Sequence, residues 1–329
     1  MSRRINWRLL LFFSLMLMVV VFLISLRFGA SQVNTTTIVK SFLNFDSGIQ
    51  QELIIRDIRL PRTLAAFLVG TCLAVAGAMM QGATRNLLAD SGLLGINAGA
   101  ALSMALVFAF FSRSNYLVIS LAAFFGAALA TGLVYLVTRY AKGGMSPLRL
   151  ILAGTAINSL LTSLSQAISL SFNLSQDLAF WFVGGAANVT WAQLKIVGPI
   201  FFVALIASFF IAPSITLLSM GDETAISLGK NPSRIRGLTM VVVLFLAGIA
   251  VSLVGSVSFI GLIVPHFVRS LVGYDYRLVI PFSAIFGGLL VTIADVCARM
   301  VNPPFETPFG ILVALIGVPF LLYLVWRES

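Results

Sequence analysis

The chain has 329 residues, of which 59% are hydrophobic and only 10% are charged, and its mean hydropathy is +1.04. Apolar runs of about 20 residues, long enough to cross a bilayer as a helix, recur along its length. This composition excludes a soluble globular protein and predicts an all-α polytopic membrane protein. The net charge of +10 does not indicate nucleic-acid binding, because the basic residues are scattered at the ends of the apolar runs, as membrane topology requires.

Turn signals divide the chain into about ten predicted spans, with no linker that would separate 1–329 into domains. These spans are 8–30, 58–81, 92–111, 116–138, 148–171, 193–212, 237–257, 260–272, 279–299 and 308–326. The first run is too long for the apolar core of a signal peptide and lacks a small-residue cleavage site, so we interpret it as a retained helix. Cys72 and Cys297 both lie in apolar runs and are predicted to be buried, reduced thiols.

Ten spans put both termini on the same side of the membrane, and the distribution of Lys and Arg favours the cytoplasmic side for them. Thirteen basic residues then face the cytoplasm: Arg3, Arg4, Arg8, Arg85, Arg139, Lys142, Arg149, Lys230, Arg234, Arg236, Arg269, Arg277 and Arg327. Eight lie outside or near the outer end: Arg27, Lys40, Arg56, Arg59, Arg62, Arg113, Lys195 and Arg299.

Several basic residues lie at the outer ends of spans, although Lys and Arg are usually concentrated on the cytoplasmic side. Arg56, Arg59 and Arg62 crowd the outer end of the second span, and Arg299 follows Asp295 by four residues in the ninth. One interpretation is that they reach for lipid headgroups and that Asp295 and Arg299 form an i,i+4 pair. The other is an outward basic patch that receives an acidic partner.

The segment Ser258–Arg269, SFIGLIVPHFVR, is broken by glycine and proline. A helix interrupted inside a membrane frees backbone groups that need partners, and such breaks often mark a pathway. We expect Pro265 to bend or start a short helix, because proline lacks an N–H and clashes with the preceding turn. His266 and Arg269 are predicted to be polar groups at the inner membrane interface and not metal ligands.

The inner loop at about 219–236 is the main cytoplasmic feature. Asp222 and Glu223 suit the N-terminus of a short helix that Gly229 would end. One face of that helix would be apolar, formed by Ala225, Ile226 and Leu228. Such a helix is either an interfacial connector or an element that sits in a groove of a soluble partner.

The sequence carries little sign of catalysis. It contains no GxxxxGK[ST] phosphate loop, one histidine and no HExxH motif, so neither an ATPase site nor a zinc site is predicted, and no cofactor is expected. Asp295 is the only carboxylate well inside an apolar run. A single buried acid is weak support for an ion-coupled secondary transporter, which would need several. An intramembrane enzyme lacks a catalytic constellation.

Motifs along nearly the whole chain resemble the FecCD-like permease subunits of ABC importers for iron–siderophores, haem and cobalamin. The matching segments are IRLPRTLAAFLVGTCLAVAGAMMQ at 58–81, NLLADSGLLGINAGAAL at 86–102, LRLILAG at 148–154, WFVGGAANVTW at 181–191, GDETAISLG at 221–229, GSVSFIGLIVPHFVR at 255–269 and ADVCARMVNPPFETPFGILVALIGVPF at 294–320. The first helix and the 31–57 loop carry little of the signal.

The resemblance implies a ten-helix subunit of type II importer fold that pairs with a second permease, identical or not. It also implies two cytoplasmic ATPase subunits, an extracytoplasmic substrate-binding protein and surrounding membrane lipids, without nucleic acid. Carried over by motif, the residues that dock the binding protein are Arg59, Arg62 and Arg299. The ATPase coupling loop holds Gly221, Asp222, Glu223, Ala225, Leu228 and Gly229. The inner gate falls at Ser146, Pro147 and Leu148, where the cobalamin permease is more polar.

From the resemblance we expect a permease subunit without its own ATPase site, in the cytoplasmic membrane. It would import an iron(III)–siderophore using ATP hydrolysed by a separate subunit. Cobalamin or haem is the alternative cargo within the family, and an ion-coupled secondary transporter is the alternative outside it.

Overall fold

The computed structural model describes residues 7–29, 33–43, 45–46, 48–111, 115–141, 145–303, 305 and 307–328. Its helices are α1 Trp7–Arg27, α2 Thr35–Leu43, α3 Gln50–Leu53, η1 Ile54–Arg59, α4 Leu60–Thr84, η2 Ser91–Leu94, α5 Ile96–Phe110, α6 Tyr116–Tyr140, α7 Pro147–Ser171, α8 Ser175–Val183, α9 Trp191–Ser219, α10 Asp222–Ser227, α11 Pro232–Val254, α12 Ile260–Val272, α13 Tyr276–Val301 and α14 Phe309–Glu328. Four basic residues of the topology count, Arg3, Arg4, Arg113 and Lys142, lie outside the described residues.

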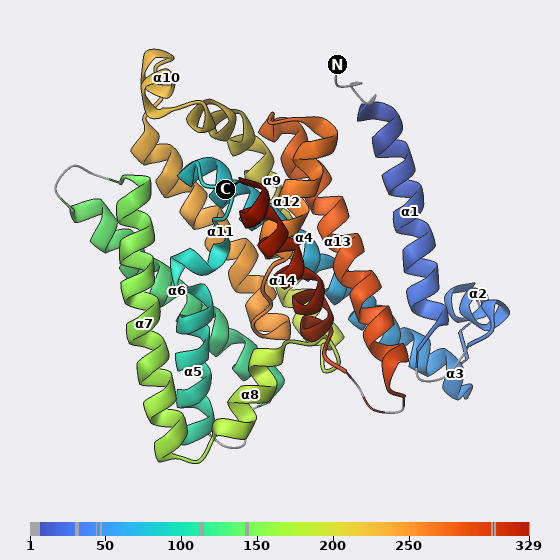
Figure 1. The fold of residues 1–329 in the computed structure, drawn as a ribbon. Helices are drawn as coiled ribbons and strands as arrows, with labels where there is room; N and C mark the ends of the chain where they lie inside the picture. Colours follow the sequence, from blue (N-terminus) through green and yellow to red (C-terminus); the bar gives the residue numbers. More distant parts are fainter. Residues whose placement is uncertain are drawn as a thin grey trace.

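The described residues form a helical bundle without strands, and this confirms the predicted all-α membrane class (Figure 1). Within the described ranges, seven helices are long and apolar enough to span a membrane, and three shorter apolar helices are α5, α12 and the stretch 309–323 of α14. The predicted count of about ten therefore stays a prediction. Short helices α2, α3 and α8 were not predicted, because they are too short to show a spanning pattern.

Figure 1 shows α10 at one end of the bundle and α2, α3 and α8 toward the other. Helices α5, α6 and α7 lie together on one side, and α1 stands at the opposite side beside α13. The start of α1 and the end of α14 are both directed toward the α10 end (Figure 1).

Helix α4 lies at the centre and packs against α9, α11, α12 and α13. Small residues permit this packing, since they let helix backbones approach closely. A Cβ added at Gly70 would collide with the carbonyl of Gly287 in α13, and one added at Gly77 with Gly261 in α12. The glycines of the second span are thus required by close contacts on two sides of α4.

The short span predicted at 260–272 is present as α12, Ile260–Val272. Gly255 and Phe259, just before it, have positive φ angles, +81° and +71°, so the helix begins at Ile260 and not at Pro265, and a bend at Pro265 stays a prediction. The carbonyl of Val254 at the end of α11 accepts a hydrogen bond of 2.9 Å from the N–H of Gly185, just after α8. The interrupted backbone is therefore satisfied by protein.

Pro265 sits inside α12, where its missing N–H would leave the carbonyl of Gly261 without a helical partner. The side chain of Gln81 in α4 replaces that donor, with Nε2 3.0 Å from the Gly261 oxygen. Its other atom, Oε1, accepts a bond of 2.6 Å from Nη1 of Arg269. A proline in α12 is therefore matched by a glutamine in α4.

The same contact places the side chain of Arg269 inside the bundle. It is buried against α4, where Oε1 of Gln81 accepts the hydrogen bond from its guanidinium, and its position at the inner membrane interface stays a prediction. His266 is half-buried, and its ring lies 5.6 Å from that of Phe320 in α14.

The two cysteines differ. Both are free, and Cys72 is buried in α4 as predicted, but Cys297 is exposed, contrary to the prediction. Ile293, Cys297 and Met300 recur at helical spacing along the exposed face of α13. An apolar run in a membrane protein contains both inward and lipid-facing positions, so hydropathy alone could not assign this thiol.

Candidate functional site

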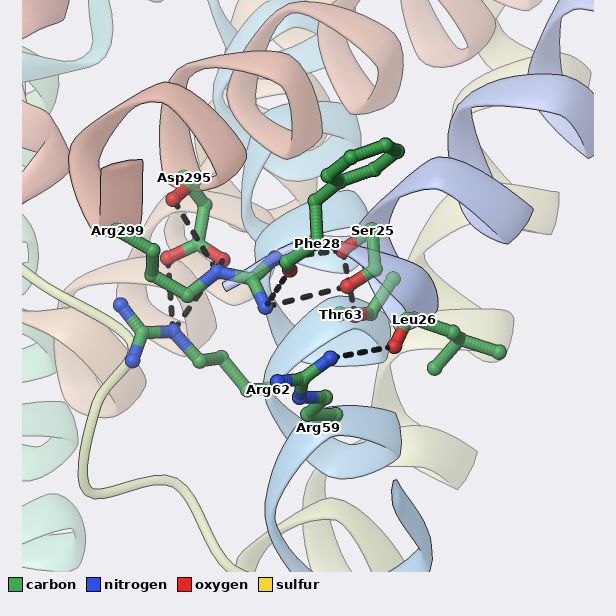
Figure 2. Close-up of polar contacts among 8 residues, drawn as sticks. All are labelled: Ser25, Leu26, Phe28, Arg59, Arg62, Thr63, Asp295 and Arg299. Carbon is green, nitrogen blue, oxygen red and sulfur yellow. Dashed lines mark hydrogen bonds and ion pairs between the residues drawn. The ribbon is translucent and has the colours of Figure 1, made fainter. Parts of the chain in front are cut away.

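Three arginines and one aspartate meet where η1, α4 and α13 converge near the end of α1 (Figure 2). We call this group the arginine cluster; its members are Arg59, Arg62, Arg299 and Asp295. The arginines are only 5–6% exposed, and Asp295 is fully buried.

Asp295 binds two of the three guanidinium groups. Nε of Arg62 lies 2.9 Å from Oδ1 of Asp295, and Nε of Arg299 lies 3.2 Å from Oδ2. The i,i+4 pair of Asp295 and Arg299 that the sequence suggested is therefore confirmed. One carboxylate, that of Asp295, thus holds two arginines that come from different helices, α4 and α13.

The end of α1 supplies further acceptors. Nη1 of Arg59 donates to the carbonyls of Leu26 at 2.8 Å and Arg27 at 2.9 Å. Nη1 of Arg299 donates to those of Ser25 at 3.2 Å and Phe28 at 3.3 Å. The last carbonyls of a helix lack helical partners and carry the negative end of its dipole, so cations stabilise them. The end of α1 thus covers the arginine cluster (Figure 2).

The structure therefore gathers the three arginines that the sequence proposed for docking, but not as an exposed patch. Each is buried and held by Asp295 or by the end of α1. The expected surface position was wrong for this conformation, whereas the docking role itself stays a prediction. Arg56, the fourth basic residue of the region, is exposed and lies 4.5 Å above the ring of Phe45.

A second polar group lies at the α10 end of the bundle. Asp222 is the first residue of α10. Its Oδ1 accepts a hydrogen bond of 2.7 Å from Nη2 of Arg236, and its Oδ2 accepts one of 3.0 Å from Nη1. Arg85, just after α4, approaches the same carboxylate at 3.4 Å. The hydrogen bonds from Arg236 lower the pKa of Asp222, which favours its ionised form.

Arg236 joins four segments although only 2% of its surface is exposed. It lies in α11, binds Asp222 of α10, and donates from Nε to the Ala83 carbonyl of α4 at 3.1 Å. Nη1 also donates to the carbonyl of Met145, two residues before α7, at 2.9 Å. We call this the Arg236 junction. From the sequence, Arg236 is recognisable only as a charge that favours the cytoplasmic side, because its partners are far away in sequence.

The inner loop forms the short helix that the sequence predicted. Gly229, at φ +72°, ends α10: its N–H bonds the Ile226 carbonyl at 2.9 Å, and that of Lys230 bonds the Ala225 carbonyl at 2.8 Å. This is a Schellman motif, which favours glycine at the left-handed position. Ala225 is buried against the bundle, while Ile226 and Leu228 are 61% and 57% exposed. Gly221 and Glu223 flank Asp222 at the start of the helix.

The predicted gate residues start α7 beside the Arg236 junction. Ser146 caps the helix, its Oγ accepting a bond of 3.4 Å from the N–H of Arg149, and Pro147 occupies the first helical position. Leu148 is 66% exposed. Their role as a gate stays a prediction. Within the described residues, no group of His, Cys, Asp and Glu side chains could hold a metal ion.

Comparison with known proteins gives one consistent result. The FecCD transport family matches residues 17–327. The chain is 44% identical to the iron(3+)-hydroxamate import system permease protein FhuB of Bacillus subtilis (strain 168), covering 93% of this chain and 79% of that protein. It is 39% identical to the Fe(3+)-citrate import system permease protein YfmD of the same organism, covering 98% and 96%. It is 35% identical to the hemin transport system permease protein HmuU of Yersinia pestis, covering 100% and 98%.

A solved structure described as an inward-facing conformation of a metal-chelate type ABC transporter superposes with a TM-score of 0.85 at 27% identity. The match covers 97% of this chain and 99% of that one. The chain therefore belongs to the FecCD transport family. It is a multi-pass cell-membrane protein with the fold of a type II ABC importer permease, as the sequence motifs indicated.

The arginine cluster predicts the effect of one substitution. Asp295→Asn removes the carboxylate that binds both Arg62 and Arg299. Breaking a buried ion pair by removing one partner typically costs about 3–5 kcal/mol. We expect a clearly lower unfolding temperature in detergent. Unfolding would be measured, in a Cys297→Ser background, by the reaction of the buried Cys72 with a maleimide dye. The exposed Asp57→Asn is the control, and equal stability of the two variants would contradict this account.

Proposed function

We propose that this chain is the permease subunit of an ABC importer that carries an iron(III)–siderophore across the cytoplasmic membrane. The observation that carries the proposal is the match, over more than nine tenths of the chain, to permeases named for ferric hydroxamate and ferric citrate import. ATP would be hydrolysed by two separate ATPase subunits, and a substrate-binding protein would deliver the chelate from outside. A second permease subunit, identical or not, would complete the pathway, and all of 1–329 would act as one domain.

Haem is the second candidate cargo, because the hemin permease of Yersinia pestis aligns with the full chain. Cobalamin remains a third, on the resemblance of the motifs alone. We place both termini and α10 in the cytoplasm and the arginine cluster at the outer end, which agrees with the excess of basic residues on the α10 side.

Uptake by a strain that lacks its own permease, complemented with this chain and its ATPase and binding protein, tests the cargo. We expect labelled iron to enter from a ferric hydroxamate or ferric citrate but not from haem, and labelled cobalamin to stay outside. Uptake should stop when ATP is depleted and continue when a protonophore is added with ATP maintained. Entry of haem or cobalamin alone would contradict the cargo, and loss of uptake with the protonophore alone would indicate an ion-coupled transporter.

The docking proposal follows from the charge of the arginine cluster. Three guanidinium groups lie together there, a kind of group that pairs with acidic side chains of a partner, and carbonyls at the end of α1 accept hydrogen bonds from Arg59 and Arg299 in this conformation. Acidic side chains of the binding protein would replace the carbonyls of Leu26 and Arg27 on Arg59. Docking would therefore require the end of α1 to move, so that binding outside is coupled to a shift of the first helix.

Arg59→Gln tests docking without inverting a buried charge. Glutamine keeps an amide donor for the α1 carbonyls but removes the cation, so we expect binding-protein affinity to fall about tenfold or more. The measurement is binding of the purified binding protein to the complete transporter in nanodiscs. Arg56→Gln, an exposed arginine one helical turn earlier, is the matched control. Loss of affinity in the control alone would place docking on the exposed surface instead.

Coupling would start at α10. Its exposed residues Ile226 and Leu228 suit an apolar groove on an ATPase subunit, and its first residue, Asp222, is held by Arg236. Arg236 also holds the carbonyl of Met145, next to the predicted gate at the start of α7. A displacement of α10 by the ATPase would therefore reach the gate through one guanidinium group. We assign Arg236 as the positioning residue of this linkage.

Arg236→Lys tests the assignment, because lysine keeps the charge but cannot bind Asp222 and two carbonyls at once. We expect the ATPase subunits to co-purify normally and ATP hydrolysis to continue, while substrate carried per ATP falls at least severalfold. A spin label at Ser146, in a Cys297→Ser background, should no longer move on ATP binding. Arg234→Lys, exposed two residues earlier, is the control. Normal transport per ATP in Arg236→Lys would refute the linkage.

A further inference from the structure

An apolar groove lies between α4, α9 and α13, and its lining includes none of the charged residues of the two polar groups described above. Its volume is about 540 Å³, within the range of small-molecule binding sites. Phe67 of α4, Phe202 of α9 and Ile285 of α13 contribute to its walls. Thr71 contributes a hydroxyl, but this hydroxyl already donates to the carbonyl of Ala284 at 2.8 Å. The walls therefore offer almost nothing to a polar chelate and suit a hydrocarbon chain.

One face of α9 lines the groove along most of the helix. Trp191, Lys195, Gly198 and Phe202 follow one another at spacings of three or four residues, which places them on a single helix face. At Gly198 an added Cβ would meet no atom within 4 Å, so the groove is open there. From Trp191 to Phe202 the helix rises about 16 Å, roughly half of the hydrocarbon core.

The end of the groove near the start of α9 carries the groups expected at the headgroup level. Trp191 donates from its indole N–H to the carbonyl of Arg56 at 2.9 Å, which fixes the ring at the bundle end. Tryptophan is enriched at membrane interfaces, and lysine reaches toward the headgroups from one turn deeper. Lys195 is exposed and makes no ion pair with any of the described residues. A cation thus stands at the mouth of an apolar groove.

We infer that this groove binds an anionic phospholipid, with one acyl chain along α9 past Gly198 and the phosphate against Lys195. The apolar walls suit the acyl chain, and the ammonium of Lys195, which makes no ion pair with the described residues, would favour a negative headgroup. This site would be a specific lipid contact that holds α4, the central helix, against α9 and α13. The inference does not depend on the identity of the transported cargo.

Fluorescence quenching by brominated lipids tests this site, because Trp191 lies in it. The purified permease would carry phenylalanine in place of Trp7, Trp181 and Trp326 and would be reconstituted in phosphatidylcholine nanodiscs. We expect dibrominated phosphatidylglycerol to quench Trp191 half-maximally at a mole fraction about fivefold lower than dibrominated phosphatidylcholine, the selectivity that one lysine provides near an anionic headgroup.

Two variants separate the parts of the proposal, each with a matched control. Lys195→Gln should abolish the difference between the two lipids, whereas Lys40→Gln, an exposed lysine of α2, should leave it unchanged. Gly198→Phe should fill the groove and reduce quenching by both lipids, whereas Gly132→Phe in α6, another glycine with open space, should not.

Equal quenching by the two lipids in the parent protein would overturn the proposal. So would unchanged selectivity in Lys195→Gln, a surface substitution that does not threaten folding. Unquenched Trp191 in the parent protein, with dissociation of permease pairs in Gly198→Phe, would show that a second subunit fills the groove.

Discussion

The absence of water from the bilayer core is the constraint on which this structure depends, because each buried polar group must find its partner within the protein. Helix α4 meets this constraint at three levels. Arg62 at one end binds Asp295 of α13, and Gln81 supplies the Gly261 carbonyl of α12 with the donor that Pro265 lacks. At the other end, Arg236 of α11 binds the carbonyl of Ala83. Close glycine contacts bring the backbones near enough for these bonds to form.

The same three contacts give the permease a physical route between its two ends. Arg62 and Ala83 are 21 residues apart on one continuous helix, a distance of about 32 Å at 1.5 Å per residue. The arginine cluster and the Arg236 junction are therefore attached to a single rigid element. On our proposal, the binding protein acts on the first and the ATPase on the second, and each would bias the position of α4 relative to its neighbours. Coupling between two sites requires such an element with alternative arrangements.

The arginine cluster shows how one set of residues can serve stability and recognition together. Buried cations are tolerated here because Asp295 and the last carbonyls of α1 accept their hydrogen bonds. The same hydrogen bonds stabilise the end of α1, and on our proposal an acidic partner would compete with these carbonyls for the arginines. At the Arg236 junction, Asp222 binds Arg236 through both of its oxygens, and a second cation, Arg85, lies 3.4 Å from Oδ1.

The sequence by itself determined the membrane class, the order of the apolar helices, the family motifs and the local signals of α10. These depend on hydropathy, on chemistry repeated within a few residues, or on one special backbone angle, as at Gly229. It also brought together Asp295 and Arg299, which are neighbours on one helix face. Only the tertiary structure decided that Arg59 and Arg62 are buried, that Arg269 points inward, that Cys297 points outward and that Arg236 joins four segments. Each of these depends on a partner distant in sequence or on which side of a uniformly apolar helix faces protein. In an apolar run, hydropathy does not distinguish the side chains that face protein from those that face lipid, so only the packing of neighbouring helices assigns them.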